Sequence, residues 1–235
     1  MRVSPRRVLG IIPARLGSER LPRKPLYPMA GRPLIEWVWR RVRGFPVLDR
    51  VVIATDSEEV MAACRAMGAE AALTSPDHTS GTERAAELVA RSEFRGYDVV
   101  VNIQGDEPFV TLEQVEGAAA LAGPFDVGTV ATPVGTLATW HDPAVVKVVR
   151  GAGGRALYFS RSPIPHVRGR EPTLAELASA EFLRHVGVYA YLPAALARWV
   201  SLPPGALEGY ERLEQLRPLA AGLTVTVWVA SGAGL

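Results

Sequence analysis

An apolar run leads directly into a basic loop near the N-terminus, in the segment Val8-Leu9-Gly10-Ile11-Ile12-Pro13-Ala14-Arg15-Leu16-Gly17-Ser18-Glu19-Arg20-Leu21-Pro22-Arg23-Lys24-Pro25-Leu26. The first five residues are continuously apolar, which is typical of a strand buried on both faces of a parallel sheet. Pro13 ends this strand. Because ligands in open α/β sheets bind beyond the carboxyl ends of the strands, we expect a binding site at the loop.

The loop residues suit a polyphosphate. Gly17 and Ser18 allow backbone N–H groups to approach an anion, and Arg15 and Lys24 supply positive charge. The pattern is neither the P-loop, which places Gly-Lys-Ser/Thr at a helix, nor the Gly-x-Gly-x-x-Gly fingerprint of dinucleotide-binding folds. A solvated basic loop is the alternative, but the position directly after a buried strand favours a nucleoside triphosphate.

Composition limits the classes of protein. The chain has 235 residues, of which 48% are hydrophobic and 21% charged, and this fits a globular α/β fold of one or two domains. A net charge of +2 gives no reason to expect nucleic acid or an anionic membrane as a partner. No membrane-spanning run or signal-peptide core is recognised, so we expect a cytoplasmic protein. The single cysteine, Cys64, excludes an internal disulfide, and its helical pattern predicts burial.

Strand and helix patterns alternate through the first 120 residues or so, which predicts a mostly parallel α/β sheet. After the first strand we expect strands at 51–54, 69–73 and 98–103 and helices at 34–43, 57–67 and 82–92. The second half predicts a mixed β insertion, with strands at 127–134, 145–150, 156–160, 182–191 and 224–230 and helices at 193–200 and 208–221. No linker is visible, so we interpret 1–235 as one domain with a nucleotide-binding half, 1–122, and a second half, 123–235.

A carboxylate follows the strand at 98–103, in the motif Asn102-Ile103-Gln104-Gly105-Asp106-Glu107-Pro108. Mg²⁺ prefers one or two protein carboxylates together with phosphate oxygens. For an isolated Gly-Asp pair an ordinary turn is the better interpretation. Combined with the basic loop after the first strand, the motif predicts that Asp106 holds Mg²⁺ against a triphosphate.

The remaining polar candidates for a binding site lie in less specific sequence patterns. Ser80-Gly81-Thr82-Glu83 reads as a helix capping box, and the neighbouring Arg84 and His78 are candidates for a base pocket. Arg161, and Arg184 with His185, suit the carboxylate of a sugar acid, although each alone is more often a surface charge. Within the predicted helix 208–221, the spacings of Glu211 with Gln215 and of Tyr210 with Glu214 present polar groups from one face.

Taken in order, the motifs resemble the 3-deoxy-D-manno-octulosonate (Kdo) cytidylyltransferases over nearly the whole chain. They are Ile12-Pro13-Ala14-Arg15, Arg20-Leu21-Pro22, Lys24-Pro25-Leu26, Ala54-Thr55-Asp56, Ser80 to Arg84, Asn102 to Pro108, Ala156 to Arg161, Leu183 to Tyr189 and Leu213 to Arg217. The resemblance implies a Rossmann-like nucleotide-diphospho-sugar transferase fold and a homodimer. It also implies transfer of CMP from CTP to Kdo, with Mg²⁺ and release of pyrophosphate, for lipopolysaccharide synthesis.

The resemblance also implies roles for individual residues. Arg15, Lys24 and Asp106 would be catalytic, with Asp106 as the metal ligand, and Arg84 and the backbone near Ala14 would meet cytosine. The implied nucleotide site comprises Pro13, Ala14, Arg15, Gly17, Ser18, Lys24, Thr55, Asp56, His78, Ser80 and Arg84. The implied sugar site comprises Gln104, Arg161, His185, Tyr189, Glu214 and Gln215.

The chain departs from the family pattern at one point. The family continues past the last strand with a second metal-binding Asp, whereas the sequence given stops at Ala233-Gly234-Leu235, so we expect weaker metal binding from this chain. Three rivals stay open: a cytidylyltransferase for sialic acid, one for 8-amino Kdo, and a CTP-binding module without turnover. A glycosyltransferase is disfavoured because Gln104-Gly105-Asp106 replaces an Asp-x-Asp motif, and a nicotinamide-dependent oxidoreductase because its fingerprint is missing after the first strand.

Overall fold

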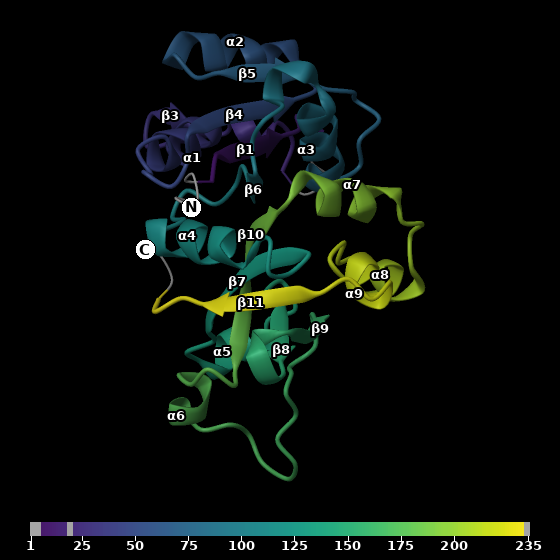
Figure 1. Ribbon diagram of the computed structural model, residues 1–235. Coiled ribbons are helices and arrows are strands. Elements are labelled where there is room, and N and C mark those ends of the chain that lie inside the picture. The colour runs from purple at the N-terminus through teal and green to yellow at the C-terminus, as the bar shows by residue number, and fades with distance from the viewer. Residues whose placement is uncertain (1–5, 18–20, 233–235) are drawn as a thin grey trace.

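The computed structural model describes residues 6–17 and 21–232, and in this part of the chain a large twisted sheet runs through the molecule (Figure 1). Its main path has the strand order β11-β7-β10-β6-β1-β4-β5, and β8 and β9 extend from β10. The strands are β1 Val8–Ala14, β4 Arg50–Thr55, β5 Ala71–Leu73, β6 Val99–Ile103, β7 Val127–Pro133, β8 Lys147–Arg150, β9 Ala156–Ser160, β10 Leu183–Tyr191 and β11 Val225–Val229. A small hairpin, β2 Pro28–Met29 with β3 Arg32–Pro33, lies outside this sheet.

Helices cover both faces of the sheet. They are α1 Leu34–Val42, α2 Glu58–Met67, α3 Gly81–Ala90, α4 Leu112–Leu121, α5 Leu137–His141, α6 Leu174–Leu177, α7 Pro193–Ser201, α8 Ala206–Glu211 and α9 Leu216–Ala220, with 3₁₀ turns η1 Lys24–Leu26, η2 Ser92–Phe94 and η3 Ala152–Gly154. One apolar core joins the sheet to α1, α2 and α4, and a second joins it to α3, α7 and α9. Figure 1 shows α1 and α4 on one side and α3 and α7 on the other.

The first half of the chain forms the predicted parallel sheet. β1 pairs in parallel with both β4 and β6, and β4 pairs in parallel with β5. The apolar run Val8–Ile12 is fully inside this sheet, as expected for a strand with helices over both faces. Because β1, β4 and β6 run in the same direction, their carboxyl ends meet at one edge, which is where the basic loop and Asp106 begin.

The two halves share one sheet because β10 lies between them. β10 pairs antiparallel with β6 of the first half and with β7 of the second, and β11 then pairs in parallel with β7. The predicted mixed β region is therefore confirmed, but it continues the main sheet instead of forming a separate layer. The pairing of β10 with β7 shifts register between Val186 and Tyr189, which marks a β-bulge in β10.

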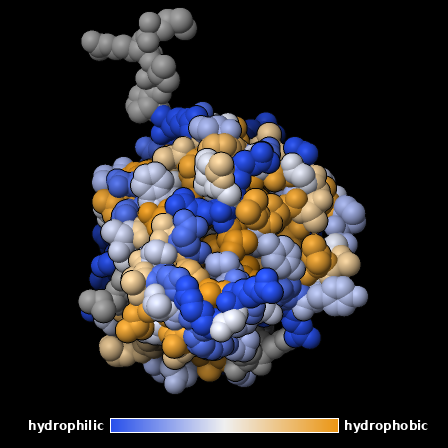
Figure 2. All heavy atoms as spheres, turned by 90° about the horizontal axis from the view of Figure 1, so that it is seen from below, coloured by the Kyte–Doolittle hydropathy of each residue, from blue (hydrophilic) through white to orange (hydrophobic). Residues whose placement is uncertain are grey.

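The end of the molecule that carries α6 extends away from the sheet (Figure 1). Seen from that end, the surface mixes hydrophilic residues with hydrophobic ones gathered near its centre (Figure 2). Leu174 of α6 is 70% exposed and Leu157 of β9 is 62% exposed. Among the helices of the described residues, none is both long and apolar enough to cross a membrane.

The prediction of one continuous helix over 208–221 is wrong. Arg212 adopts a left-handed conformation, with φ of 51°, and ends α8, and α9 begins only at Leu216. A left-handed residue cannot continue an α-helix, so Glu211 and Gln215 do not share a helix face. Helices α4, α5 and α6 lie outside the ranges predicted from sequence.

Candidate active site

The basic loop folds back on the end of β1. The backbone N–H of Arg23 donates to the Leu16 carbonyl at 3.3 Å, and Arg23 is left-handed, with φ of 58°, just before η1. Such a backbone is uncommon for a residue other than glycine and is often found at functional sites. This fold-back directs the Lys24 side chain to Asp106 at the end of β6, with which it forms an ion pair.

Lys24 and Asp106 face one cavity of about 240 Å³. Its lining comes from the ends of β1 and β6 and from η1: Pro13, Ala14, Arg15, Lys24, Pro25, Gln104, Gly105 and Asp106. Gly105 lets the two strand ends approach, because a Cβ at this position would lie 2.6 Å from the Pro13 carbonyl oxygen. The structure thus brings together most residues of the predicted triphosphate site. Ser18 lies outside the described residues, and within the described ranges nothing beyond its chain neighbours lies within 4 Å of where a Cβ on the exposed Gly17 would be.

A second carboxylate lies beside Asp106. Burial raises the pKa of Glu107, and the charge of Asp106 raises it further, whereas Arg184 and Lys24 oppose this rise. Among the described residues, no three acidic, histidine or cysteine side chains form a ready-made metal cage. Mg²⁺ nevertheless fits this donor set, because it is commonly held by one or two carboxylates and completed by substrate phosphates.

Asp56 connects the basic loop to the helix on the other side of the site. Its Oδ1 accepts from the Leu16 backbone N–H at 3.3 Å, and its Oδ2 accepts from Arg84 at 2.9 Å. Arg84 is only 1% exposed and also donates to the Thr74 hydroxyl at 2.5 Å. Thr55 stabilises the position of Thr74, because its carbonyl accepts from both the backbone N–H and the hydroxyl of Thr74. The contact of Arg84 with cytosine stays a prediction.

The capping-box prediction is confirmed, whereas His78 lies elsewhere. Ser80 caps α3 by accepting from the Glu83 backbone at 3.1 Å, and the Glu83 carboxylate accepts from the Ser80 N–H at 3.3 Å. His78 bonds Glu87 at 2.6 Å and lines a separate cavity of about 630 Å³ between α3 and α7. The structure does not bring His78 to the cavity that contains Lys24 and Asp106.

The β10 bulge lies beside the predicted sugar-binding residue Gln104. A Cβ on Gly187 would lie 2.9 Å from the Gln104 Cγ, so the absence of a side chain at the bulge makes room for Gln104. Val188 pairs with Ile103, the last residue of β6, and His185 therefore lies past the end of that strand. His185 and Tyr189 lie against each other, with ring centroids 5.3 Å apart. His185 and Tyr189 are thus in contact, and Gln104 lies against Gly187, which is between them in sequence. His185 also lines a small cavity of about 180 Å³ with Glu107 and Arg184, whereas Gln104 lines the cavity that contains Lys24 and Asp106.

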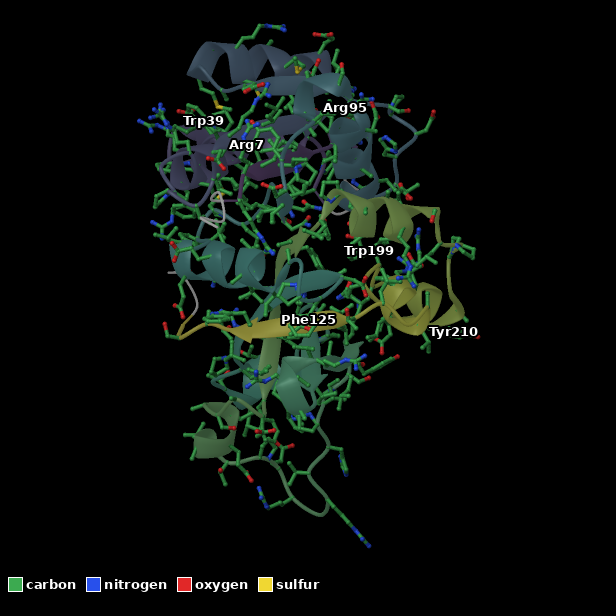
Figure 3. The ribbon with its side chains drawn as sticks, viewed as in Figure 1. Arg7, Trp39, Arg95, Phe125, Trp199 and Tyr210 are labelled. Atoms are coloured by element: carbon green, nitrogen blue, oxygen red, sulfur yellow. The ribbon has the colours of Figure 1, made fainter. Side chains whose placement is uncertain are left out.

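Tyr189 extends this region toward α7 and α9. Trp199 of α7 points toward the sheet and packs edge-on against Tyr189 (Figure 3). Burial raises the pKa of Tyr189 well above its ordinary value, and the nearby Glu214 raises it further. Glu214 accepts from the Thr82 hydroxyl at 2.9 Å, and burial raises the pKa of its carboxyl. Gln215, the residue before α9, is 3% exposed.

Arg161 is held by carbonyl groups. Its guanidinium donates to the Glu211 carbonyl at 2.7 Å, to the Pro143 carbonyl at 3.0 Å and to the Arg212 carbonyl at 3.4 Å. The Glu211 carboxylate in turn accepts from the Arg161 backbone at 2.9 Å. These bonds tie the end of β9 to the end of α8, and they give Arg161 a structural role beside the two predicted from sequence, a contact with a sugar carboxylate and a surface charge.

Sequence reasoning assigned no individual role to several polar residues that the structure shows in hydrogen bonds. Lys147 is completely buried, and its ammonium donates to three backbone carbonyls at 2.6–2.9 Å. Thr82 and Thr129 bond Glu214 and His185, respectively. Their positions on α3 and β7 give no sequence signal, because both partners lie more than 50 residues away along the chain.

This arrangement defines a class of protein. A mostly parallel sheet that meets a cationic loop and a carboxylate at the ends of adjacent strands is the framework of an α/β nucleotidyltransferase. The profile of the cytidylyltransferase family matches residues 9–225. The chain belongs to the cytidylyltransferase family.

Two curated relatives within this family carry the same name. The chain is 49% identical to the 3-deoxy-manno-octulosonate cytidylyltransferase of Gemmatimonas aurantiaca, over 94% of this chain and 85% of the relative. It is 45% identical to the protein of the same name from Syntrophobacter fumaroxidans, over 94% of this chain and 88% of the relative.

Solved structures agree with the fold. A CMP:2-keto-3-deoxy-manno-octonic acid synthetase, whose structure contains CTP, matches with a TM-score of 0.85 and 37% identity, over 97% of this chain and 92% of that one. The inositol-1-phosphate CTP transferase of T. maritima matches with a TM-score of 0.61 and 14% identity, over 94% and 84% of the two chains, which supports the fold alone.

Proposed function

We propose that this protein transfers CMP from CTP to Kdo, giving CMP-Kdo and pyrophosphate, and so activates Kdo for lipopolysaccharide synthesis. The observation that carries the proposal is the cavity at the ends of β1 and β6, in which Lys24 faces Asp106. A cation for phosphate and a carboxylate for a metal at one strand edge suit nucleotidyl transfer. The relatives named for this reaction support the choice of both substrates.

The chain's own residues perform positioning and charge neutralisation in this reaction. Arg15 and Lys24, which line the cavity, bind the phosphate oxygens of CTP, and Gln104 lies between this cavity and the residues of β10. The anomeric hydroxyl of Kdo loses its proton to water and attacks the α-phosphorus in line, a new P–O bond forms, and the bond to the pyrophosphate oxygen breaks. Holding both substrates in this geometry removes much of the entropic barrier, and the cations stabilise charge on the departing pyrophosphate.

We also propose that Asp106 holds Mg²⁺ in this cavity. When bound, the ion would neutralise phosphate charge and orient the triphosphate. Replacement of Asp106 by Asn should abolish Mg²⁺-dependent turnover. It should leave the melting temperature nearly unchanged, because the side chains of Lys24 and Asp106 are 31% and 40% exposed and surface ion pairs contribute little. The control is Glu116→Gln on the exposed face of α4. Retained turnover in Asp106→Asn would remove Asp106 from this role.

A substrate panel tests the function. Pyrophosphate release is measured with CTP, UTP, ATP or GTP, each paired with Kdo, 8-amino Kdo or sialic acid, over a Mg²⁺ titration. The proposal expects release that requires CTP and Kdo together. Release with another sugar acid in preference to Kdo would assign the protein to that sugar, and CTP binding without release would identify a binding module.

We further propose that the protein is a cytoplasmic homodimer. Its use of a nucleoside triphosphate supports the location, and the exposed Leu157 and Leu174 in the second half support self-association. Sedimentation equilibrium should give twice the chain mass, and Leu157→Asp should weaken the association. A monomer at all accessible concentrations would contradict the proposal.

A further inference from the structure

The Thr129 hydroxyl lies between two groups at the β10 bulge. Its oxygen lies 2.8 Å from the Val188 carbonyl and 2.9 Å from Nε2 of His185. The carbonyl oxygen can only accept, whereas the imidazole nitrogen can either donate or accept, so we assign the single proton of the hydroxyl to the bond with Val188. This bond supplies a donor to the carbonyl where the regular pairing of β10 with β7 is interrupted.

The same bond fixes the protonation of His185. Because the Thr129 oxygen has already given its proton to Val188, it can only accept from the imidazole, and Nε2 must carry a proton. Burial lowers the pKa of His185 to about 3, so the ring is neutral near pH 7 and holds one proton. Nδ1 is therefore left with a free lone pair.

The Nδ1 lone pair is available to a ligand. In the part of the chain that the structure describes, Nδ1 has no hydrogen-bond partner and does not count among the buried polar atoms that lack one. Phe159 and Tyr189 restrict the ring, with centroids 5.2 Å and 5.3 Å from it. His185 lies beyond the end of β6, at the edge where ligands of such sheets bind.

We propose that Thr129 is a positioning residue that locks His185 in the Nε2–H tautomer, so that Nδ1 accepts a hydrogen bond from a hydroxyl group of the sugar acid. The inference rests on the proposed function, because it assumes that the sugar acid occupies the β10 side of the site. It makes the site selective for a hydrogen-bond donor at this position. A group that can only accept would face the Nδ1 lone pair and leave both unpaired.

Two-bond ¹H–¹⁵N correlation spectra of the uniformly labelled protein test the tautomer directly, without substrate. The chain has four histidines, so His185 is assigned by its absence in His185→Gln. The wild-type protein should show the Nε2–H form. Thr129→Val, which keeps the shape but removes the hydroxyl, should show a mixture of tautomers, and Thr129→Ser should restore the wild-type form.

Kinetics with CTP and Kdo give the second measurement. In Thr129→Val the Nδ1 atom of His185 is no longer fixed as a hydrogen-bond acceptor, so the KM for Kdo should rise about tenfold while the KM for CTP stays unchanged. Thr129→Ser should restore the KM for Kdo to the wild-type value. An Nδ1–H form in the wild type, an unchanged tautomer in Thr129→Val, or an equal rise in both KM values would overturn the proposal. Failure of the function itself would appear as no turnover in the wild type, whereas the spectra would still report the tautomer.

Discussion

Gly105 lies where the ends of β1 and β6 approach each other beside the triphosphate site. Adding one methyl group there therefore tests how closely the two strand ends must pack for activity. The Cβ of Gly105→Ala would lie 2.6 Å from the Pro13 carbonyl oxygen, whereas Cβ contacts are essentially never under 3.0 Å and ordinary ones begin at 3.4 Å. The ends of β1 and β6 must therefore separate by about 0.4–0.8 Å. The obstacle is backbone, which cannot rotate out of the way.

This displacement has two measurable consequences. A misplacement approaching 1 Å costs about 10²-fold in rate, so we expect kcat to fall by between about tenfold and 100-fold. Overpacking should also lower the free energy of unfolding by about 1–3 kcal/mol. The assays are steady-state pyrophosphate release and urea denaturation. The matched control is Gly44→Ala, where nothing lies within 4 Å of the added Cβ. A kcat for Gly105→Ala within about twofold of the wild type would refute this account of the cavity, because the rate of the chemical step depends steeply on how the reacting groups are placed.

Three further changes probe other parts of the structure. Gly187→Ala should push the flexible Gln104 side chain away from the bulge and raise the KM for Kdo but not for CTP; equal effects on both substrates would contradict the placement of Gln104 on the sugar side. Lys147→Met removes three hydrogen bonds from a buried ammonium to backbone carbonyls and should lower the free energy of unfolding by about 3 kcal/mol in urea denaturation, whereas Arg168→Met at an exposed position should change it little; equal stability of the two variants would contradict this prediction. Burial raises the pKa of Glu87, but hydrogen bonds from Ser75, Arg91 and His78 outweigh it and lower the pKa from 4.5 to about 2. The contribution of the ionised Glu87 to the free energy of unfolding is therefore complete above pH 4.5 and is lost as the pH falls toward 2. The stability difference between wild type and Glu87→Gln should shrink over that window, and a constant difference would count against the shift.

Local patterns predict much of the first half. The apolar run Val8–Ile12 identifies β1, and alternation with amphipathic helices identifies the parallel sheet. Because parallel strands end at the same edge, the order of motifs was enough to expect Lys24 and Asp106 in one place. These features follow from short segments and simple geometry, and for that reason they are visible in sequence.

Long-range pairing and unusual backbone conformations are not visible in this way. Nothing in residues 183–191 indicates that β10 inserts between β6 and β7, because strand partners are set by packing across the whole chain. Arg212 ends α8 in a conformation that usually signals glycine or asparagine, so the break was missed. The bond between Thr129 and His185 depends on a bulge, which has no sequence signature here.

The central claim is that a bond forms between the α-phosphorus of CTP and the anomeric oxygen of Kdo. The most direct measurement is a ³¹P spectrum of the reaction with CTP and Kdo labelled with ¹³C at its anomeric carbon. The account predicts a new phosphodiester signal split by coupling to that carbon, together with an equal amount of pyrophosphate. Consumption of CTP without the coupled signal, or no consumption in the presence of Kdo and Mg²⁺, would contradict it.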